Sequence, residues 1–189
     1  MKKLFTLVLA ACAFYSCCNN EPKQFAGFIE DATMNNVVVK ELTGDQTQTF
    51  STATADMTQA NGMLLGAPII VDYKGNLKEV TEATKVSVDA TYCNAVGEWT
   101  MPDPIDSTKV MGINLMIQGD AASVNMATMV YKSWELQGPV GKLLLHGQSI
   151  GNGETIDFTE NATLSEKDGK FTLAIDGTDV VYSKEGIIE

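Results

Sequence analysis

The side chains best suited to acid–base chemistry in this sequence are two carboxylate pairs and one histidine. The pairs are Asp103 with Asp106 and Asp157 with Glu160, and the histidine is His146. Two carboxylates at a suitable separation can hydrolyse a glycosidic bond, but spacing along the chain does not fix that separation. His146 has no serine or cysteine partner in a recognisable nucleophile motif. We therefore expect these carboxylates to lie in solvated loops of an acidic chain, and we expect the protein not to be an enzyme.

No metal site or cofactor is expected from the remaining metal-binding side chains. A Cys/His site is disfavoured because the chain has a single histidine, and the Asp-Gly pairs at 168–169 and 176–177 lack the ligand rhythm of a calcium loop. Methionine sulfur binds Cu(I), although methionines more often fill gaps in a core. Five methionines are concentrated in the second half of the chain: Met101, Met111, Met116, Met126 and Met129.

The N-terminus has the pattern of a secretory signal peptide. Lys2 and Lys3 precede an apolar run that extends from Leu4 to about Tyr15. This run is too short to span the ~30 Å hydrocarbon core of a bilayer as a helix, but it suits the centre of a signal peptide. Residues 1–16 are therefore predicted to be removed.

Cys17 is the predicted lipidation site. Ser16-Cys17 resembles a bacterial lipobox, in which the cysteine after the cut is acylated, although Phe14 stands where the motif prefers leucine. Cleavage before Cys12 is the first alternative and before Cys18 the second, and an ordinary secreted protein is the third. Acylation with two or more chains makes a stable membrane anchor. Residues 17–24 are then a short tether, and the membrane, most simply the outer membrane of the cell envelope, is a partner.

The charge of the chain excludes nucleic acid as an expected partner. Its 13 basic residues are all lysines, against 24 acidic residues, for a net charge of −11. Removing Lys2 and Lys3 leaves 11 basic residues against 24, a net charge of −13. Phosphate backbones are held by basic side chains, and arginine provides the bidentate contacts that lysine does not. The acidic surface instead keeps an envelope protein soluble.

Two β modules are predicted, an OB-like small barrel over 25–92 and a larger barrel over 95–189, so the fold class is all-β. The first contains five β-type runs, with one or two helical turns expected over 53–62, "ATADMTQANG", before the last two. That order is typical of an OB-type barrel. In the second, eight candidate strands are joined by glycine-rich connections such as "QGD", "GNG" and "DGT". Eight strands with tight hairpins predict a closed up-and-down barrel.

The second module also resembles a known family. Gly97-Glu98-Trp99 resembles the G-x-W signature of lipocalin-type barrels, whose tryptophan closes one end of the cavity. The stretch "GDAASVNMATMVYKSWEL" with "LLLHGQSIGNG" is similar to the lipocalin-like domain of envelope lipoproteins of Bacteroides-type bacteria. The resemblance implies an eight-stranded lipocalin-like barrel that binds a small apolar or amphipathic ligand. The alternative is a structural or interaction lipoprotein whose barrel is filled by its own side chains.

Candidate ligand contacts follow from this fold. Strand alternation places Trp134 and Leu136 on one face, and Tyr131, Ser133 and Glu135 on the other. The two tryptophans are therefore expected to be core residues first and ligand contacts second. The candidate ligand-binding residues are Trp99, Met116 and Trp134.

Ser107 is a candidate modification site. Asp106-Ser107-Thr108 resembles the D-[S/T]-[A/I/L/V/M/T] acceptor for O-glycosylation in Bacteroides-type bacteria. The run "PDPIDST" around it contains Pro102 and Pro104, which predict an exposed loop because proline is excluded from central strands.

Overall fold

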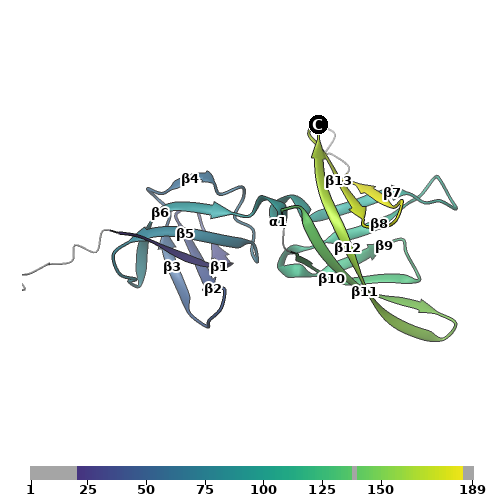
Figure 1. Ribbon diagram of the computed structural model, residues 1–189, viewed down its shortest axis with the longest axis horizontal. Helices are drawn as coiled ribbons and strands as arrows, with labels where there is room; N and C mark the ends of the chain where they lie inside the picture. The colour runs from purple at the N-terminus through teal and green to yellow at the C-terminus, as the bar shows by residue number, and fades with distance from the viewer. Residues whose placement is uncertain (1–20, 138–139, 185–189) are drawn as a thin grey trace, which may run out of the picture.

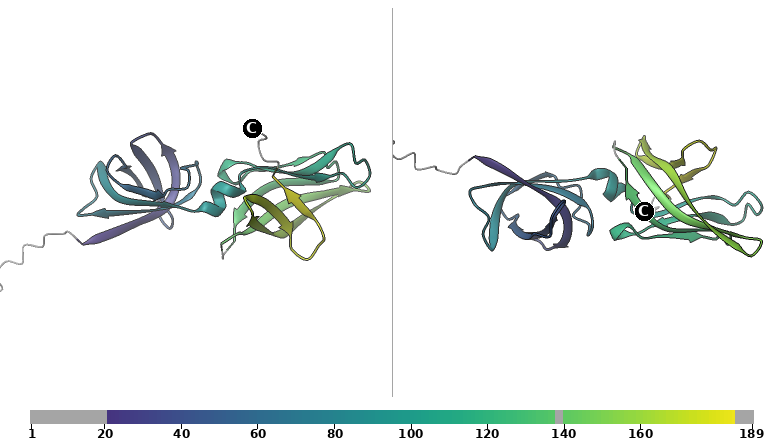
Figure 2. Two further views of the ribbon diagram at one scale, coloured as in Figure 1. Left: turned by 90° about the horizontal axis from the view of Figure 1, so that it is seen from above. Right: turned by 60° about the horizontal axis from the view of Figure 1, so that its bottom comes forward.

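The structure, a computed structural model, describes residues 21–137 and 140–184 and contains two β modules joined by a short helix (Figure 1). The modules lie end to end, and the helix α1 (Ala90–Ala95) lies between them in all three views (Figures 1 and 2). No helix in the described part of the chain is long and apolar enough to cross a membrane.

The first module is a mixed sheet that curls into a small barrel. Its strands are β1 (Pro22–Ala32), β2 (Asn36–Glu41), β3 (Thr47–Ser51), β4 (Asp56–Gln59), β5 (Pro68–Lys74) and β6 (Val80–Val88). The order β3-β2-β1-β5-β6 is antiparallel throughout, and a parallel pairing of β3 with β6 closes the ring. The first strand begins at Pro22, so the last three residues of the predicted tether lie in β1.

Alternating side chains build the core of this barrel. In β1 and β2, buried residues alternate with half-buried or exposed ones, as expected for strands with one face inside. Phe50 of β3 is fully buried, with its ring 5.4 Å from that of Phe25 and 5.7 Å from that of Tyr73. Tilted aromatic pairs at these separations add to the stabilisation from burial.

The prediction of helical turns over 53–62 was wrong, because this segment contains the strand β4. Asp56 and Gln59 pair in parallel with Lys85 and Ser87 of β6. β3 pairs only with the beginning of β6, so the rest of that edge is open to β4. The Asp56 carboxylate accepts hydrogen bonds from the backbone N–H and the hydroxyl of Thr58, at 3.0 and 2.7 Å. An unpaired sheet edge satisfies the backbone groups of this segment, so tertiary context outweighs its weak helix propensity.

Helix α1 begins at a clear capping residue. The Asp89 side chain accepts hydrogen bonds from the backbone N–H groups of Thr91 and Tyr92, at 2.7 and 3.2 Å. An aspartate in this position satisfies donors that a helix N-terminus otherwise leaves unpaired. The cap thereby fixes Thr91 and Tyr92, both buried, between the two modules.

The second module contains the eight predicted strands. They are β7 (Gly97–Pro102), β8 (Val110–Leu115), β9 (Ala121–Val124), β10 (Met129–Leu136), β11 (Lys142–Gly151), β12 (Glu154–Lys167), β13 (Lys170–Ile175) and β14 (Val181–Ser183), with the short turn η1 (Ile117–Gly119) between β8 and β9. The sheet order β10-β11-β12-β13-β14-β7-β8-β9 is antiparallel at every step. The prediction of an all-β chain with an eight-stranded up-and-down barrel in its second half is confirmed, although the barrel is only nearly closed.

The gap lies between β9 and β10, where side-chain hydrogen bonds supplement a single bridge. Asp120 forms that bridge with Ser133. The Ser123 hydroxyl donates to the carbonyl oxygen of Met129 at 2.6 Å and accepts from the N–H of Tyr131 at 2.8 Å. One serine side chain thus bonds two backbone groups that a regular ladder would pair.

The predicted faces of β10 need one correction. Tyr131 is 2% exposed and lies inside the barrel with Trp134, not on the opposite face. The pairing of β10 with β11 shifts between Tyr131 and Ser133, so Lys132 is the extra residue of a β-bulge. A bulge reverses the alternation on one side of it, which is why Tyr131 and Trp134 share a face despite their spacing of three.

Candidate functional site

The predicted lipidation sites lie outside the described residues. Cys12, Cys17 and Cys18 belong to residues 1–20, so their assignment remains a prediction. Cys93 lies in α1, where it is half-buried and its thiol donates to the carbonyl oxygen of Gly62 at 3.2 Å. Burial raises the pKa of the Cys93 thiol, which keeps it protonated and unreactive at neutral pH.

Trp99 lies at the base of the barrel and is fully buried. Its indole N–H donates to the carbonyl oxygen of Ala95 at 2.7 Å, and the Lys184 ammonium lies 5.3 Å from its ring centroid. The same ammonium donates to the carbonyl oxygens of Asn94 and Val96 at the C-terminal end of α1. Burial lowers the Lys184 pKa, while a cation over an indole face is favourable. Trp99 therefore seals this end and contacts no open space.

The barrel interior contains mostly buried apolar side chains. Trp134 is 3% exposed. Inward-facing residues with no measurable exposure include Ile113, Leu115, Leu143, Leu145 and Leu173. An eight-stranded barrel is just wide enough to be filled in this way. Leu143 and Leu145 share the buried face of β11, and Leu173 and Ile175 share that of β13.

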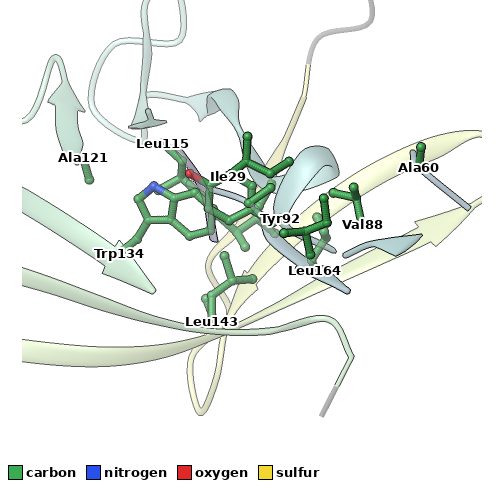
Figure 3. Packing of buried hydrophobic residues seen from close by; sticks show 14 of the residues in the cluster. Ile29, Ala60, Val88, Tyr92, Leu115, Ala121, Trp134, Leu143 and Leu164 are labelled. Carbon is green, nitrogen blue, oxygen red and sulfur yellow. The ribbon is translucent and has the colours of Figure 1, made fainter. Parts of the chain in front are cut away.

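A cleft of about 1080 Å³ lies where the first module meets the end of the barrel. Its apolar walls come from both modules and from α1. The residues that line it include Phe28, Leu42 and Pro68 from the first module, Tyr92 from α1, and Trp134 and Leu136 from β10. Trp134, Tyr92 and Ile29 gather in one hydrophobic cluster (Figure 3). Pockets for small molecules usually enclose about 300–1,000 Å³, so the cleft is large enough for one.

Tyr92 is the central contact between the modules at this cleft. Its ring stacks on that of Trp134, with the centroids 5.0 Å apart and the planes at 28°. Its hydroxyl donates to the carbonyl oxygen of Leu65 at 3.0 Å and accepts from the N–H of Gln118 at 2.7 Å. Burial raises the pKa of Tyr92, so the hydroxyl keeps its proton at neutral pH. One side chain thus joins a loop of the first module to η1 of the second.

Gly66 permits this close approach. Its φ of +82° is a left-handed conformation that favours glycine. A Cβ atom there would lie 2.7 Å from the Tyr92 hydroxyl oxygen and 3.0 Å from the Cα of Gln118. Any larger residue would push the two modules apart at the cleft.

Met116 reaches the site through its backbone. Its carbonyl oxygen accepts a hydrogen bond from the Trp134 indole N–H at 2.8 Å, which fixes the orientation of the ring. Of the three predicted ligand contacts, therefore, only Trp134 lines the cleft itself. Met116 orients the Trp134 ring through its carbonyl oxygen, and Trp99 is buried at the base of the barrel.

The charged residues of the cleft are Glu30, Lys40 and Glu135. Glu30 accepts a hydrogen bond from the Thr47 hydroxyl at 3.3 Å. Glu135 lies 3.5 Å from the His146 ring. Within the described part of the chain, no hydrogen bond or ion pair engages the exposed ammonium of Lys40. The cleft therefore presents one positive charge without a partner.

The first carboxylate pair stabilises a turn. The Asp103 carboxylate accepts from the N–H groups of Ile105 and Asp106, at 2.7 and 3.2 Å. Hydrogen bonds from Thr108 lower the pKa of Asp106, which also pairs with Lys109 at 3.0 Å. Such contacts are typical of capped turns in loops.

The second pair lies in the strand β12 and not in a loop, so the expectation of a solvated loop was wrong for it, and its carboxylates do not converge. Asp157 is exposed and accepts from the Gln148 amide at 2.9 Å, whereas Glu160 accepts from the buried Tyr131 hydroxyl at 2.6 Å. Because side chains three residues apart on a strand point to opposite faces, these carboxylates cannot act on one substrate. No group of His, Cys, Asp or Glu able to hold a metal ion is present within 21–137 and 140–184.

Ser107 is exposed in the loop between β7 and β8, beside Asp106 and Thr108, where the Thr108 hydroxyl donates to Asp106 at 2.6 Å. Pro102 is the last residue of β7, and the loop begins immediately after it. The exposure of Ser107 is compatible with modification, which remains a prediction.

The sequence did not indicate that residues 28, 42 and 92 belong to one site, because they lie on elements far apart in the chain. Only the alternation of β1 carried a signal, since it leaves the large apolar Phe28 on the outer face, 40% exposed. A single exposed apolar side chain is common on protein surfaces, so this signal alone did not identify the site.

Comparisons with known proteins concern the second half of the chain. Residues 93–185 match the lipocalin-like family. The crystal structure of a lipocalin-like protein from Bacteroides thetaiotaomicron VPI-5482, at 1.95 Å resolution, is 40% identical in sequence to the matched part. The match covers 48% of this chain and 96% of that one, with a TM-score of 0.41. A comparison with curated proteins found no match. Through residues 93–185, the chain belongs to the lipocalin-like family.

Proposed function

We propose that this protein is a lipid-anchored lipoprotein of the cell envelope that binds a small apolar or amphipathic molecule and catalyses no reaction. The observation that carries the binding function is the cleft between the modules, where Phe28 is 40% and Leu42 57% exposed next to Trp134 and Leu136. A roomy apolar cleft with a few polar groups is the usual form of a small-molecule site.

A neutral solvatochromic dye, Nile red, tests this function. Its fluorescence should rise on addition of the full chain, and Phe28→Ala or Leu42→Ala should weaken its binding several-fold, because each removes apolar contact area. The control is Ile156→Ala, since Ile156 is 61% exposed on β12 and does not line the cleft. Equal binding by the wild type and both cleft variants would contradict the proposal.

The anchor is supported by the charged, apolar and small-residue order that ends at Cys17. Cys17→Ser should release the protein from membranes or block its processing, as fractionation would show. Mass spectrometry that finds an unmodified Cys17 inside the mature chain would refute the anchor. The outer membrane remains the proposed location.

A second function, that of a structural or interaction lipoprotein, is favoured by the buried barrel interior. The inward side chains Trp99, Leu145 and Leu173 have no measurable exposure. If Nile red does not bind and chemical cross-linking in cells captures a defined envelope protein, this second function replaces the first.

We also infer that the first module is an OB-like barrel. Its antiparallel strands β1, β2 and β3, the parallel pairing of β3 with β6, and the return of β5 beside β1 support this. Nucleic acid is not proposed as a partner, because the chain contains no arginine and carries a net negative charge.

A further inference from the structure

We propose that the ligand of the cleft is a single-chain amphiphile with one negative charge, whose head group is bound by Lys40 and whose chain lies along Phe28, Leu42 and Leu136. This inference rests on the proposed binding function and specifies its ligand class. It uses residues of the first module, which lie outside the lipocalin-like part of the chain.

The apolar and charged parts of this site are adjacent in the sheet. Phe28 of β1 and Lys40 of β2 are direct cross-strand partners. Side chains of such partners lie on one face with their Cβ atoms about 4.5–5.5 Å apart. Leu42 follows Lys40 by two residues, and its N–H donates to the carbonyl oxygen of Ala26 at 3.0 Å, which keeps it beside β1. The outer face of β1 and β2 therefore presents an ammonium between two exposed apolar side chains.

The facing wall belongs to β10 and completes the apolar track. Leu136 is half-buried, and Trp134 is held in place by Tyr92 and by the carbonyl oxygen of Met116. Because these side chains are already fixed, a ligand chain does not have to order them on binding. A flexible alkyl chain can lie against the apolar side chains on both walls of this track.

The charges of the cleft select the head group. Lys40 is the lining cation without a described partner, so it favours an anion. Glu30 and Glu135 line the same cleft, and the whole chain carries a net charge of −11. A head group with two or more negative charges would be repelled by these carboxylates. A monoanion such as a carboxylate matches Lys40 with the least repulsion.

Isothermal titration calorimetry with three ten-carbon probes tests the inference. Decanoate, decanol and decyltrimethylammonium have the same chain and differ in the charge of the head group. Decanoate should bind the full chain more tightly than decanol and decyltrimethylammonium, because only its head group pairs with the Lys40 ammonium. Lys40→Met should weaken decanoate binding about three- to tenfold, because it removes one partly exposed charge-assisted contact, and should leave decanol binding unchanged.

Two variants serve as controls. Lys40→Arg keeps the positive charge and should retain most of the affinity for decanoate. Lys74→Met removes an exposed lysine at the far end of β5 and should have no effect. This comparison separates local binding by Lys40 from a general effect of net charge.

The outcomes distinguish the inference from the function on which it rests. If decanol and decanoate bind equally well, and Lys40→Met changes neither, the apolar cleft binds ligands but the head-group assignment is overturned. If no probe binds, both the inference and the proposed binding function fail. Selective weakening of decanoate in Lys40→Met, with Lys74→Met unchanged, supports both.

Discussion

Replacing Tyr92 with phenylalanine would measure how strongly the two modules are coupled. The change removes only the hydroxyl oxygen, so the stacking on Trp134, with centroids 5.0 Å apart, is kept. It deletes two hydrogen bonds, one to the carbonyl oxygen of Leu65 at 3.0 Å and one from the N–H of Gln118 at 2.7 Å. These two groups belong to different modules, and each loses its described partner.

The expected loss follows from these two bonds. A hydrogen bond contributes about 0.5–1.5 kcal/mol net to stability, so the full chain should lose about 1–3 kcal/mol of unfolding free energy. Water can reach the site from the open cleft and partly replace the hydroxyl, which favours the lower half of that range. With a urea dependence of about 1–3 kcal/mol/M, the unfolding midpoint should fall by roughly 1 M.

Urea unfolding followed by tryptophan fluorescence measures this loss, and Tyr73→Phe provides the matched control. The Tyr73 ring contacts Phe50, but its hydroxyl has no hydrogen-bond partner among the described residues. Its removal should cost less than about 0.5 kcal/mol. If Tyr92→Phe costs no more than Tyr73→Phe, the hydroxyl does not couple the modules, and our reasoning about the cleft as a fixed junction is wrong.

Three further predictions concern the barrel and its surface. Trp134→Ala should destabilise the full chain by about 3–5 kcal/mol, because Trp134 is 3% exposed, and a loss under about 1 kcal/mol in urea unfolding would show that it is not a core residue. Burial raises the pKa values of Tyr92, Tyr131 and Tyr182 above the usual value of about 10. The stability that depends on these neutral phenols should therefore be fully present below pH ~10 and decrease above it. In Tyr131→Phe this decrease should be smaller, because one of the three phenols is absent. An unchanged urea midpoint between pH 8 and 11 would contradict this prediction. If Ser107 is glycosylated, the native protein should exceed the mass of polypeptide plus acyl chains, and Ser107→Ala should remove the excess; a native mass without excess would refute the modification.

The strands of the barrel were predictable because their signals are local. Alternation along β11 and β13, and the glycine-rich connections between strands, are visible within about ten residues. The burial of Trp99 at one end of the barrel was expected from the resemblance of Gly97-Glu98-Trp99 to a family signature. These features depend little on distant parts of the chain.

The features that sequence reasoning missed depend on distant partners. The strand β4 forms because β6 leaves part of its edge open beyond β3, which no property of residues 53–62 reveals. The bulge at Lys132 depends on the register with β11, and it moves Tyr131 to the inside.

The cleft was missed for the same reason. It brings Lys40 and Trp134, which are 94 positions apart, to one surface. Such a site requires the relative placement of two modules, and local patterns do not encode that placement.

The contacts of Lys184 determine the order in which the modules can be completed during synthesis. This side chain bonds the carbonyl oxygens of Asn94 and Val96, so the start and the end of the barrel meet at one point. The first module needs only residues up to Val88 for its own sheet and can fold while the barrel is still being made. The barrel, in contrast, cannot complete the cover over Trp99 until Lys184 has been added, because the Lys184 ammonium lies 5.3 Å from the centroid of the indole ring. Until then, one face of the Trp99 ring lacks its cover, so the apolar base of the barrel stays open to unwanted contacts until the last strand is in place.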